Sequence, residues 1–213
     1  MSFITFNLAI FIAPFIYIFI HFFSKHFHHQ ATYYRLAALV IALLTVLLNI
    51  SFLDFLITSG HLGLSLFILV IFTSILPKKS KIYKNLSLVR GDLAIIGFML
   101  LIPHGMARLN LALSGYNSTG LFAMIIFTPL FITSFLVIRK KMKPIRWKKL
   151  HQFAYIAYGL IYIHVGFNLS INLNNLFIRL SPHALLYHLL ALTYLFGRVI
   201  KRIQQNKIDS NMN

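Results

Sequence analysis

Long apolar stretches separated by short basic segments occupy almost the whole chain. Most of them approach the roughly 20 residues that a helix needs to cross the hydrocarbon core of a bilayer. The pattern therefore predicts an all-α fold, a polytopic membrane helical bundle of about seven transmembrane helices. The predicted spans are residues 3–23, 32–52, 61–76, 91–112, 119–138, 150–171 and 182–200.

The positive charges of the chain fall almost entirely on one side of this arrangement. Every Lys and Arg except Arg108 and Arg179 lies near the end of the first, third, fifth or seventh span, or in the segment that follows it. Cytoplasmic loops carry the excess of Lys and Arg in membrane proteins. We therefore expect a multi-pass protein of the plasma membrane with its N-terminus outside and its C-terminus in the cytoplasm.

Composition narrows the possible functions. The formal net charge of +17 would suggest a nucleic-acid partner in a soluble chain, but here the charges lie in short loops, so membrane orientation and anionic headgroups account for them. No nucleic acid is expected as a partner. The chain has no cysteine, which excludes a disulfide framework, a thiolate-ligated heme and a covalently attached c-type heme.

Two histidines inside predicted spans are candidate ligands. His104 and His164 lie at similar depth in the outer half of spans four and six, as two axial ligands of one b-type heme iron would. His188 in span seven reaches a comparable depth and is a rival ligand. Two unrelated buried histidines bonded to neighbouring helices would give the same pattern, so spacing alone leaves both interpretations open.

The remaining histidines and the aspartates need no special chemistry. His61 and His183 stand at helix ends near the outer surface, and Asp54 and Asp92 stand near span ends, where capping or solvation explains them. An interfacial polar collar explains the group at the inner end of the first span, which consists of His21, His26, His28 and His29.

A basic segment at residues 139–149 precedes the sixth span, and His151 lies at the inner end of that span. Its members beside His151 are Arg146, Trp147, Lys148 and Lys149. Topology and lipid contact are the default explanation. The same cluster could hold the phosphate of a flavin such as FMN, or receive a quinone, and His151 could be a further heme ligand.

Two stretches of the sequence resemble a known family. They read V-R-G-D-L-A-I-I-G-F-M-L-L-I-P-H-G at residues 89–105 and R-W-K-K-L-H-Q-F-A-Y, followed by I-H, at residues 146–164. This pattern is similar to the ferric reductase-like transmembrane domain family, and within it to the heme-binding membrane subunits of methionine sulfoxide reductase systems. The similarity covers roughly residues 60–202.

The resemblance implies a domain organisation and a set of heme-associated residues. Residues 32–202 would form a six-helix ferric reductase-like heme domain, preceded by an extra transmembrane helix with a His-rich loop at residues 1–31 and followed by a polar tail at residues 203–213. His104, His151 and His164 match the heme-associated histidines of the family.

The resemblance also implies a function. Members bind b-type heme, with flavin involvement in some, and pass electrons from a cytoplasmic flavin or quinol donor to an extracytoplasmic acceptor. No G-x-G-x-x-G motif occurs here, so the donor and the acceptor would be separate proteins or molecules. The alternative is a non-redox membrane protein, a small transporter or an assembly factor, in which the histidines are structural.

Overall fold

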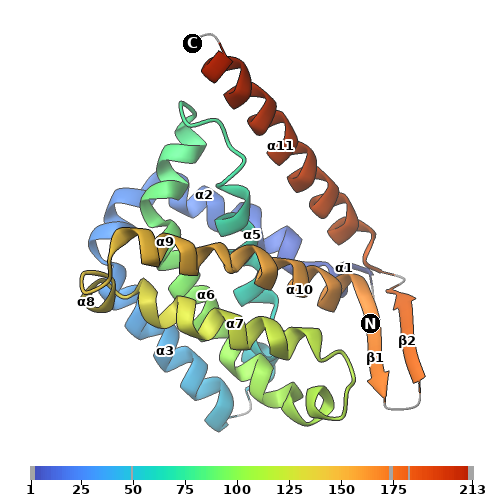
Figure 1. Cartoon of the computed structure of the whole chain (residues 1–213). Coiled ribbons are helices and arrows are strands. Elements are labelled where there is room, and N and C mark those ends of the chain that lie inside the picture. The colour runs from blue at the N-terminus through green and yellow to red at the C-terminus, as the bar shows by residue number, and fades with distance from the viewer. Residues whose placement is uncertain (1–2, 49, 173–174, 182, 211–213) are drawn as a thin grey trace.

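The computed structural model describes residues 3–48, 50–172, 175–181 and 183–210, and side-chain surroundings for these except residues 168–179 and 207–210. The described chain is predominantly helical (Figure 1). The first half contains α1 (Phe3–Phe6), α2 (Leu8–His29), α3 (Ala31–Leu48), α4 (Ser51–Leu53), the π-helical turn η1 (Asp54–Thr58), α5 (His61–Phe72) and α6 (Lys81–Leu113). The second half contains α7 (Thr119–Ser134), α8 (Leu136–Arg139), α9 (Pro144–Gln152), α10 (Ala154–Gly166), strands β1 (Phe167–Asn172) and β2 (Asn175–Leu180), and α11 (Leu185–Ser210).

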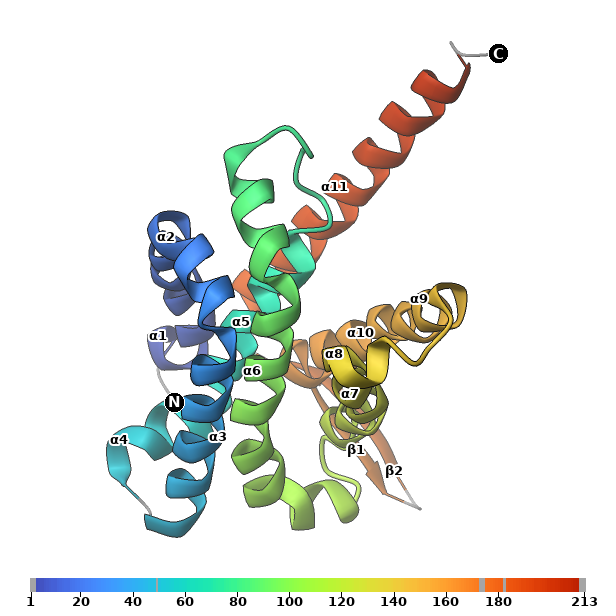
Figure 2. The same ribbon diagram turned by 90° about the vertical axis from the view of Figure 1, so that its left-hand side faces the viewer.

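Helix α6 is the central element of the bundle. It packs against α2, α3 and α5 and also against α7, which in turn packs against α10. Figure 2 shows α6 upright, with α2 and α3 on one side and α7, α9 and α10 on the other. The helix starts at Ser80, whose hydroxyl accepts a hydrogen bond from the Tyr83 N–H and so satisfies one of the free donors of the first turn.

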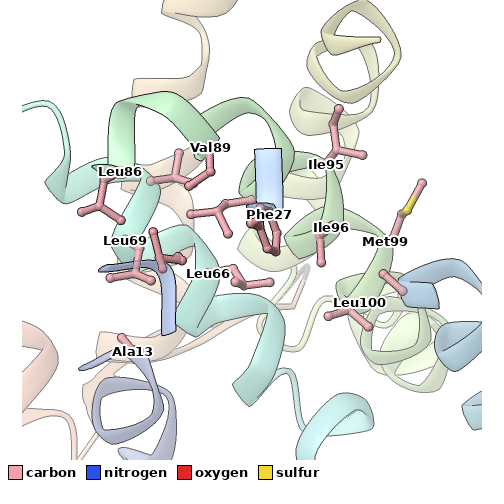
Figure 3. Packing of buried hydrophobic residues seen from close by; sticks show 14 of the residues in the cluster. Ala13, Phe27, Leu66, Leu69, Leu86, Val89, Ile95, Ile96, Met99 and Leu100 are labelled. Atoms are coloured by element: carbon pink, nitrogen blue, oxygen red, sulfur yellow. The ribbon is translucent and has the colours of Figure 1, made fainter. Parts of the chain in front are cut away.

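The main hydrophobic core joins α2, α3, α5 and α6. Leu93 and Val89 of α6 are buried completely or nearly so, and Leu66 and Leu69 of α5 pack in the same cluster (Figure 3). Phe27 of α2 reaches into it and stacks on Tyr34 of α3, with ring centroids 4.5 Å apart. Many apolar side chains on the outer faces of these helices are exposed, as expected of helices that face lipid.

Among the described residues, four helical stretches are long and apolar enough to cross a membrane. They are Leu8–His29, Ala31–Leu48, Ser51–Phe72 and Lys81–Leu113, and α7 is a shorter apolar helix. The helical, membrane-type architecture predicted from the sequence is therefore confirmed. The predicted number of seven spans stays unconfirmed, because α7 and α10 have only 16 and 13 residues and α11 carries several charges in its second half.

The predicted sixth span, residues 150–171, differs most from the structure. The helix is interrupted at Phe153 and ends at Gly166, after which Phe167 is extended and opens a β-hairpin. β1 pairs antiparallel with β2 in the register Phe167↔Leu180. The segment is rich in asparagine, which favours turns over helix interiors and explains why the helix stops there. This two-stranded pairing is an addition to the predicted all-α fold, which the rest of the described chain follows.

The last helix is longer than predicted and leaves the bundle. α11 runs from Leu185 to Ser210 instead of residues 182–200, and its C-terminal half projects away from the other helices (Figure 2); Pro182 lies outside the described residues. Several hydrogen bonds attach it to the bundle. Among them, Lys201 donates to the carbonyl of Ser74 at 2.7 Å, and the Tyr187 hydroxyl donates to the carbonyl of Phe6 at 3.3 Å.

Candidate functional site

His104 and His164 meet although sixty residues separate them in sequence. His104 follows Pro103 within α6, and His164 lies in the last turn of α10. Their ring centroids are 6.0 Å apart and the ring planes are inclined at 82°. The matched depth expected from the sequence therefore corresponds to direct proximity in the fold.

A backbone carbonyl orients each of the two imidazoles. His104 Nδ1 lies 2.8 Å from the carbonyl oxygen of Thr58, and His164 Nδ1 lies 3.3 Å from that of Asn117. A carbonyl can only accept, so each Nδ1 carries the proton and donates it. In a neutral imidazole the lone pair then remains on Nε2, which is the arrangement usual for histidines that ligate a metal.

Asn117 forms two hydrogen bonds with His164. Its side-chain amide donates to the carbonyl of His164 at 3.0 Å, while its own carbonyl accepts from the imidazole of the same residue. The residue has a positive φ of 50°, a conformation that Asn tolerates better than most residues. The loop between α6 and α7 therefore fixes the orientation of His164 at the end of α10.

Two glycines pack against the pair. A Cβ atom at Gly120 would lie 2.7 Å from His164 Nδ1, and one at Gly60 would lie 3.2 Å from the His104 ring. Gly60 also has a φ of 82°, which side chains rarely adopt, at the turn between η1 and α5. Each imidazole thus lies directly against the backbone of one glycine, where a Cβ atom would crowd the ring.

A cavity of about 400 Å³ opens beside the histidine pair. Its wall is mostly apolar and includes Phe98, Phe127 and Met124, together with both imidazoles. Arg108 stands one helical turn after His104 on the same wall and is exposed. The volume is within the range of sites for cofactors and small ligands.

Sequence reasoning missed the contributions of Gly60, Asn117 and Gly120, because they depend on loops that approach the histidines from elsewhere in the chain.

The pair has the spacing of two ligands on one metal ion. Two imidazoles that each bind at about 2.0–2.1 Å place their ring centroids roughly 6 Å apart. No group of three or more His or acidic side chains suited to hold a metal occurs among the described residues. Two imidazoles alone leave the coordination of a metal incomplete, so any metal held here would need its other ligands from a bound group.

His151 and His188, the other predicted ligands, do not line this cavity. His188 Nδ1 lies 2.8 Å from the Tyr162 hydroxyl, and its ring packs on Phe167. His151 belongs to α9, where its Nε2 lies 3.2 Å from the Thr133 hydroxyl. Their roles as heme ligands stay predictions from the sequence.

The basic segment around His151 forms a second, separate cluster. The Trp147 ring lies 4.1 Å from the imidazole of His151, and its indole N–H donates to the Thr133 carbonyl at 3.1 Å. The guanidinium of Arg139 also lies over the indole ring, 4.4 Å from its centroid. Arg146, Lys148 and Lys149 are exposed on the same short helix.

Two residues interpreted as surface groups are buried. Asp92 is only 5% exposed; it accepts from the Arg35 guanidinium and lies 3.3 Å from His28 Nδ1. His61 is also 5% exposed, and its Nε2 has no hydrogen-bond partner among the described residues. The sequence suggested an exposed position for both because their burial depends on packing between helices, which hydropathy along the chain does not show.

Comparison with known proteins gives one distant relative. The chain is 28% identical over 165 residues to an uncharacterized protein of Treponema pallidum (strain Nichols), a match that covers 71% of this chain and 46% of the relative. The chain thus matches less than half the length of that protein. No family model and no solved structure matches the chain. None of these comparisons tests the similarity to the ferric reductase-like family, which therefore stays a prediction from the sequence.

Proposed function

We propose that the chain is a membrane electron-transfer protein that holds one b-type heme between α6 and α10. His104 and His164 would be the axial ligands. One observation supports the proposal most strongly: the ring centroids of these two imidazoles lie 6.0 Å apart beside a mostly apolar cavity. Each Nδ1 faces a backbone carbonyl, which leaves Nε2 for a ligand. A bound heme supplies a one-electron carrier in the low-dielectric interior, where no soluble redox group can enter.

Other residues of the cavity suit the edge of such a macrocycle. Its apolar wall would contact the ring, and Arg108 provides a guanidinium for a carboxylate of the cofactor. Among the described residues no acidic side chain forms an ion pair with Arg108. The only acids of the chain are Asp54, Asp92 and Asp209, so a carboxylate at Arg108 would have to come from a ligand or a partner.

The cluster around His151 would serve as the entry site for the electron donor. Arg146, Lys148 and Lys149 surround it with positive charge that suits the phosphate of FMN, and the indole of Trp147 offers a flat surface to a flavin or quinone ring. The imidazole of His151 would take up or release the proton that accompanies quinol or flavin oxidation. The donor itself, cytoplasmic flavin or membrane quinol, would be a separate molecule or protein.

The acceptor would stand on the opposite side of the membrane. The heme site is at the end of α6 and α10 away from the basic segments, which the positive-inside rule assigns to the cytoplasm. Electrons would therefore leave toward an extracytoplasmic protein. The resemblance to the heme-binding membrane subunits of methionine sulfoxide reductase systems favours a methionine sulfoxide reductase or another reductase subunit as that partner.

The test is the absorption spectrum of the purified protein after expression with heme supplied. Reduced-minus-oxidised spectra should show a b-type signal in the unaltered protein and in the His26→Ala control, which replaces an exposed histidine. His104→Ala and His164→Ala should each abolish it, with folding monitored by elution and thermal unfolding.

Two outcomes would contradict the assignment. Full heme content in both variants would exclude the pair as axial ligands, and loss of heme in His188→Ala with retention in His164→Ala would move the ligand to α11. A colourless unaltered protein would instead favour the alternative of a non-redox transporter or assembly factor with structural histidines.

A further inference from the structure

A second cavity lies on the opposite side of α6 from the histidine pair. It is a groove of about 230 Å³ between α2, α3, α5 and α6, and its lining is apolar except for the hydroxyl of Tyr34. α2 and α3 both pack along α6 but contact each other little, since they diverge from their junction at Gln30. Phe19 and Ile41 of the lining are partly exposed, at 42% and 38%, so the groove faces the surroundings of the bundle.

Charged residues adjoin one end of this groove. Phe27, Tyr34 and Leu93 line the end nearest the junction, and each is followed or preceded in sequence by a charged or titratable residue outside the lining. These neighbours are His28, Arg35 and Asp92, which contact one another as described above. A long apolar groove with a charged group at one end matches an amphiphile that carries one polar head.

The charge at this end is positive. Asp92 is the one acid within α2, α3 or α6, and its carboxylate already accepts from Arg35 and contacts His28. The Nε of Arg35 is buried and has no hydrogen-bond partner among the described residues. Lys25, His26 and His29 add further positive or protonatable groups to the last turns of α2. The Arg35 side chain as a whole is 27% exposed, so an anionic headgroup at its accessible part would balance this excess.

We propose that this groove binds one glycerophospholipid with an anionic headgroup. The phosphate would lie at Arg35, and an acyl chain would fill the groove along α6. The lining from Leu93 to Leu100 extends roughly 10 Å along the helix, a length that suits a large part of an acyl chain. A neutral quinone head would leave the positive charge at this end unmatched, so the charge favours a phospholipid.

The experiment uses the full-length protein, delipidated in a mild detergent. Thermal unfolding and native mass spectra are recorded with added phosphatidylglycerol or with phosphatidylcholine of the same acyl chains. Phosphatidylglycerol should remain bound at one per chain and raise the melting temperature more than phosphatidylcholine does.

Two variants distinguish lipid binding in the groove from non-specific stabilisation of the protein by lipid. Ala37→Phe fills the groove from an exposed lining position, and Val40→Phe introduces the same side chain at an exposed position of α3 outside the lining. The first should lose the retained lipid and the difference between lipids, whereas the second should behave like the unaltered chain. The double variant Arg35→Gln/Asp92→Asn removes both charges of the pair together and should lose only the preference for the anionic lipid.

Three results would overturn the proposal. Equal stabilisation by both lipids would show that no anionic head is recognised. An unchanged response of Ala37→Phe would place any bound lipid elsewhere. A quinone, and no phospholipid, retained through purification and lost in Ala37→Phe would identify a different occupant.

Discussion

At the scale of single residues, the hydrogen-bond partners of the two imidazoles decide which ring nitrogen remains available to a ligand. A buried histidine whose two ring nitrogens both bond to protein is structural, whereas one held only through Nδ1 keeps Nε2 for a ligand. His104 and His164 are of the second kind, since their recorded hydrogen bonds are to the carbonyls of Thr58 and Asn117 through Nδ1. Glycines at positions 60 and 120 make this close approach of backbone and ring possible.

Replacing Gly120 by alanine tests that arrangement. The new methyl group would lie 2.7 Å from His164 Nδ1, so the imidazole must move and should no longer share a metal ion with His104. We expect Gly120→Ala to lose most of the b-type absorption while the protein still folds. Gly159→Ala is the matched control on α10, because nothing lies within 4 Å of its new Cβ. Equal heme content in the two variants would contradict the prediction.

At the scale of elements, the connection between α3 and α6 depends on the buried pair Arg35–Asp92. Asp92 is almost inaccessible, and its carboxylate offers the only counter-charge that the described residues show for Arg35. Removing one member of a buried ion pair leaves the other charge without compensation. The pair thus joins the N-terminal helices to the central helix.

Substitution of Asp92 by asparagine should therefore destabilise the bundle. We expect Asp92→Asn to lower the free energy of unfolding by about 3 kcal/mol, as is typical when one partner of a buried pair is removed. The double variant Arg35→Gln/Asp92→Asn should be closer to the unaltered chain, because no unpaired charge remains. Melting temperatures in one detergent provide the measurement, and a single variant no less stable than the double one would contradict the expectation.

His151 belongs to α9 and lies outside the cavity beside His104 and His164. His151 contacts Thr133 and Trp147, so its substitution should not change the ligands of the proposed heme. We expect His151→Gln to keep the full b-type spectrum. Its rate of reduction by a reduced flavin or quinol should fall by about tenfold, equivalent to about 1.4 kcal/mol. Stopped-flow absorbance gives the rate, with His26→Ala as the control; loss of the spectrum would instead make His151 a ligand.

At the scale of the whole molecule, aromatic side chains occupy the region between the cavity and α9. Phe67 stacks on Phe127 at 4.7 Å, and Tyr158 packs edge-on against both. Phe98 stacks on Phe131 at 4.7 Å beside them. Tightly packed rings leave little room for a second macrocycle within this cluster.

The heme stoichiometry follows from this packing. A pyridine hemochrome assay should give one heme per chain, because the described residues offer one cavity that contains two facing histidines. Protein concentration from amino-acid analysis supplies the denominator. A ratio of two would require a second ligand pair elsewhere, with His151 or His188 as its first candidate.

The sequence by itself determined the membrane-type helical architecture, the basic side of the bundle and the two best candidate ligands. These features are properties of local composition: span length follows from apolar runs, and His104 and His164 stand out because imidazoles are rare inside such spans. The hairpin at residues 167–180 was missed because an apolar stretch rich in asparagine fits a membrane helix by hydropathy and a turn by local propensity.

Only the tertiary structure decided which polar groups meet. The carbonyls of Thr58 and Asn117, the glycines behind the imidazoles and the Arg35–Asp92 pair come from segments far apart in the chain. Hydropathy assigns each residue a depth but no neighbour across the bundle, since the rotation of each helix about its axis is set by packing. For that reason the chain's composition could indicate a membrane protein with two notable histidines, while the packing of α6 and α10 was needed to bring them to one site.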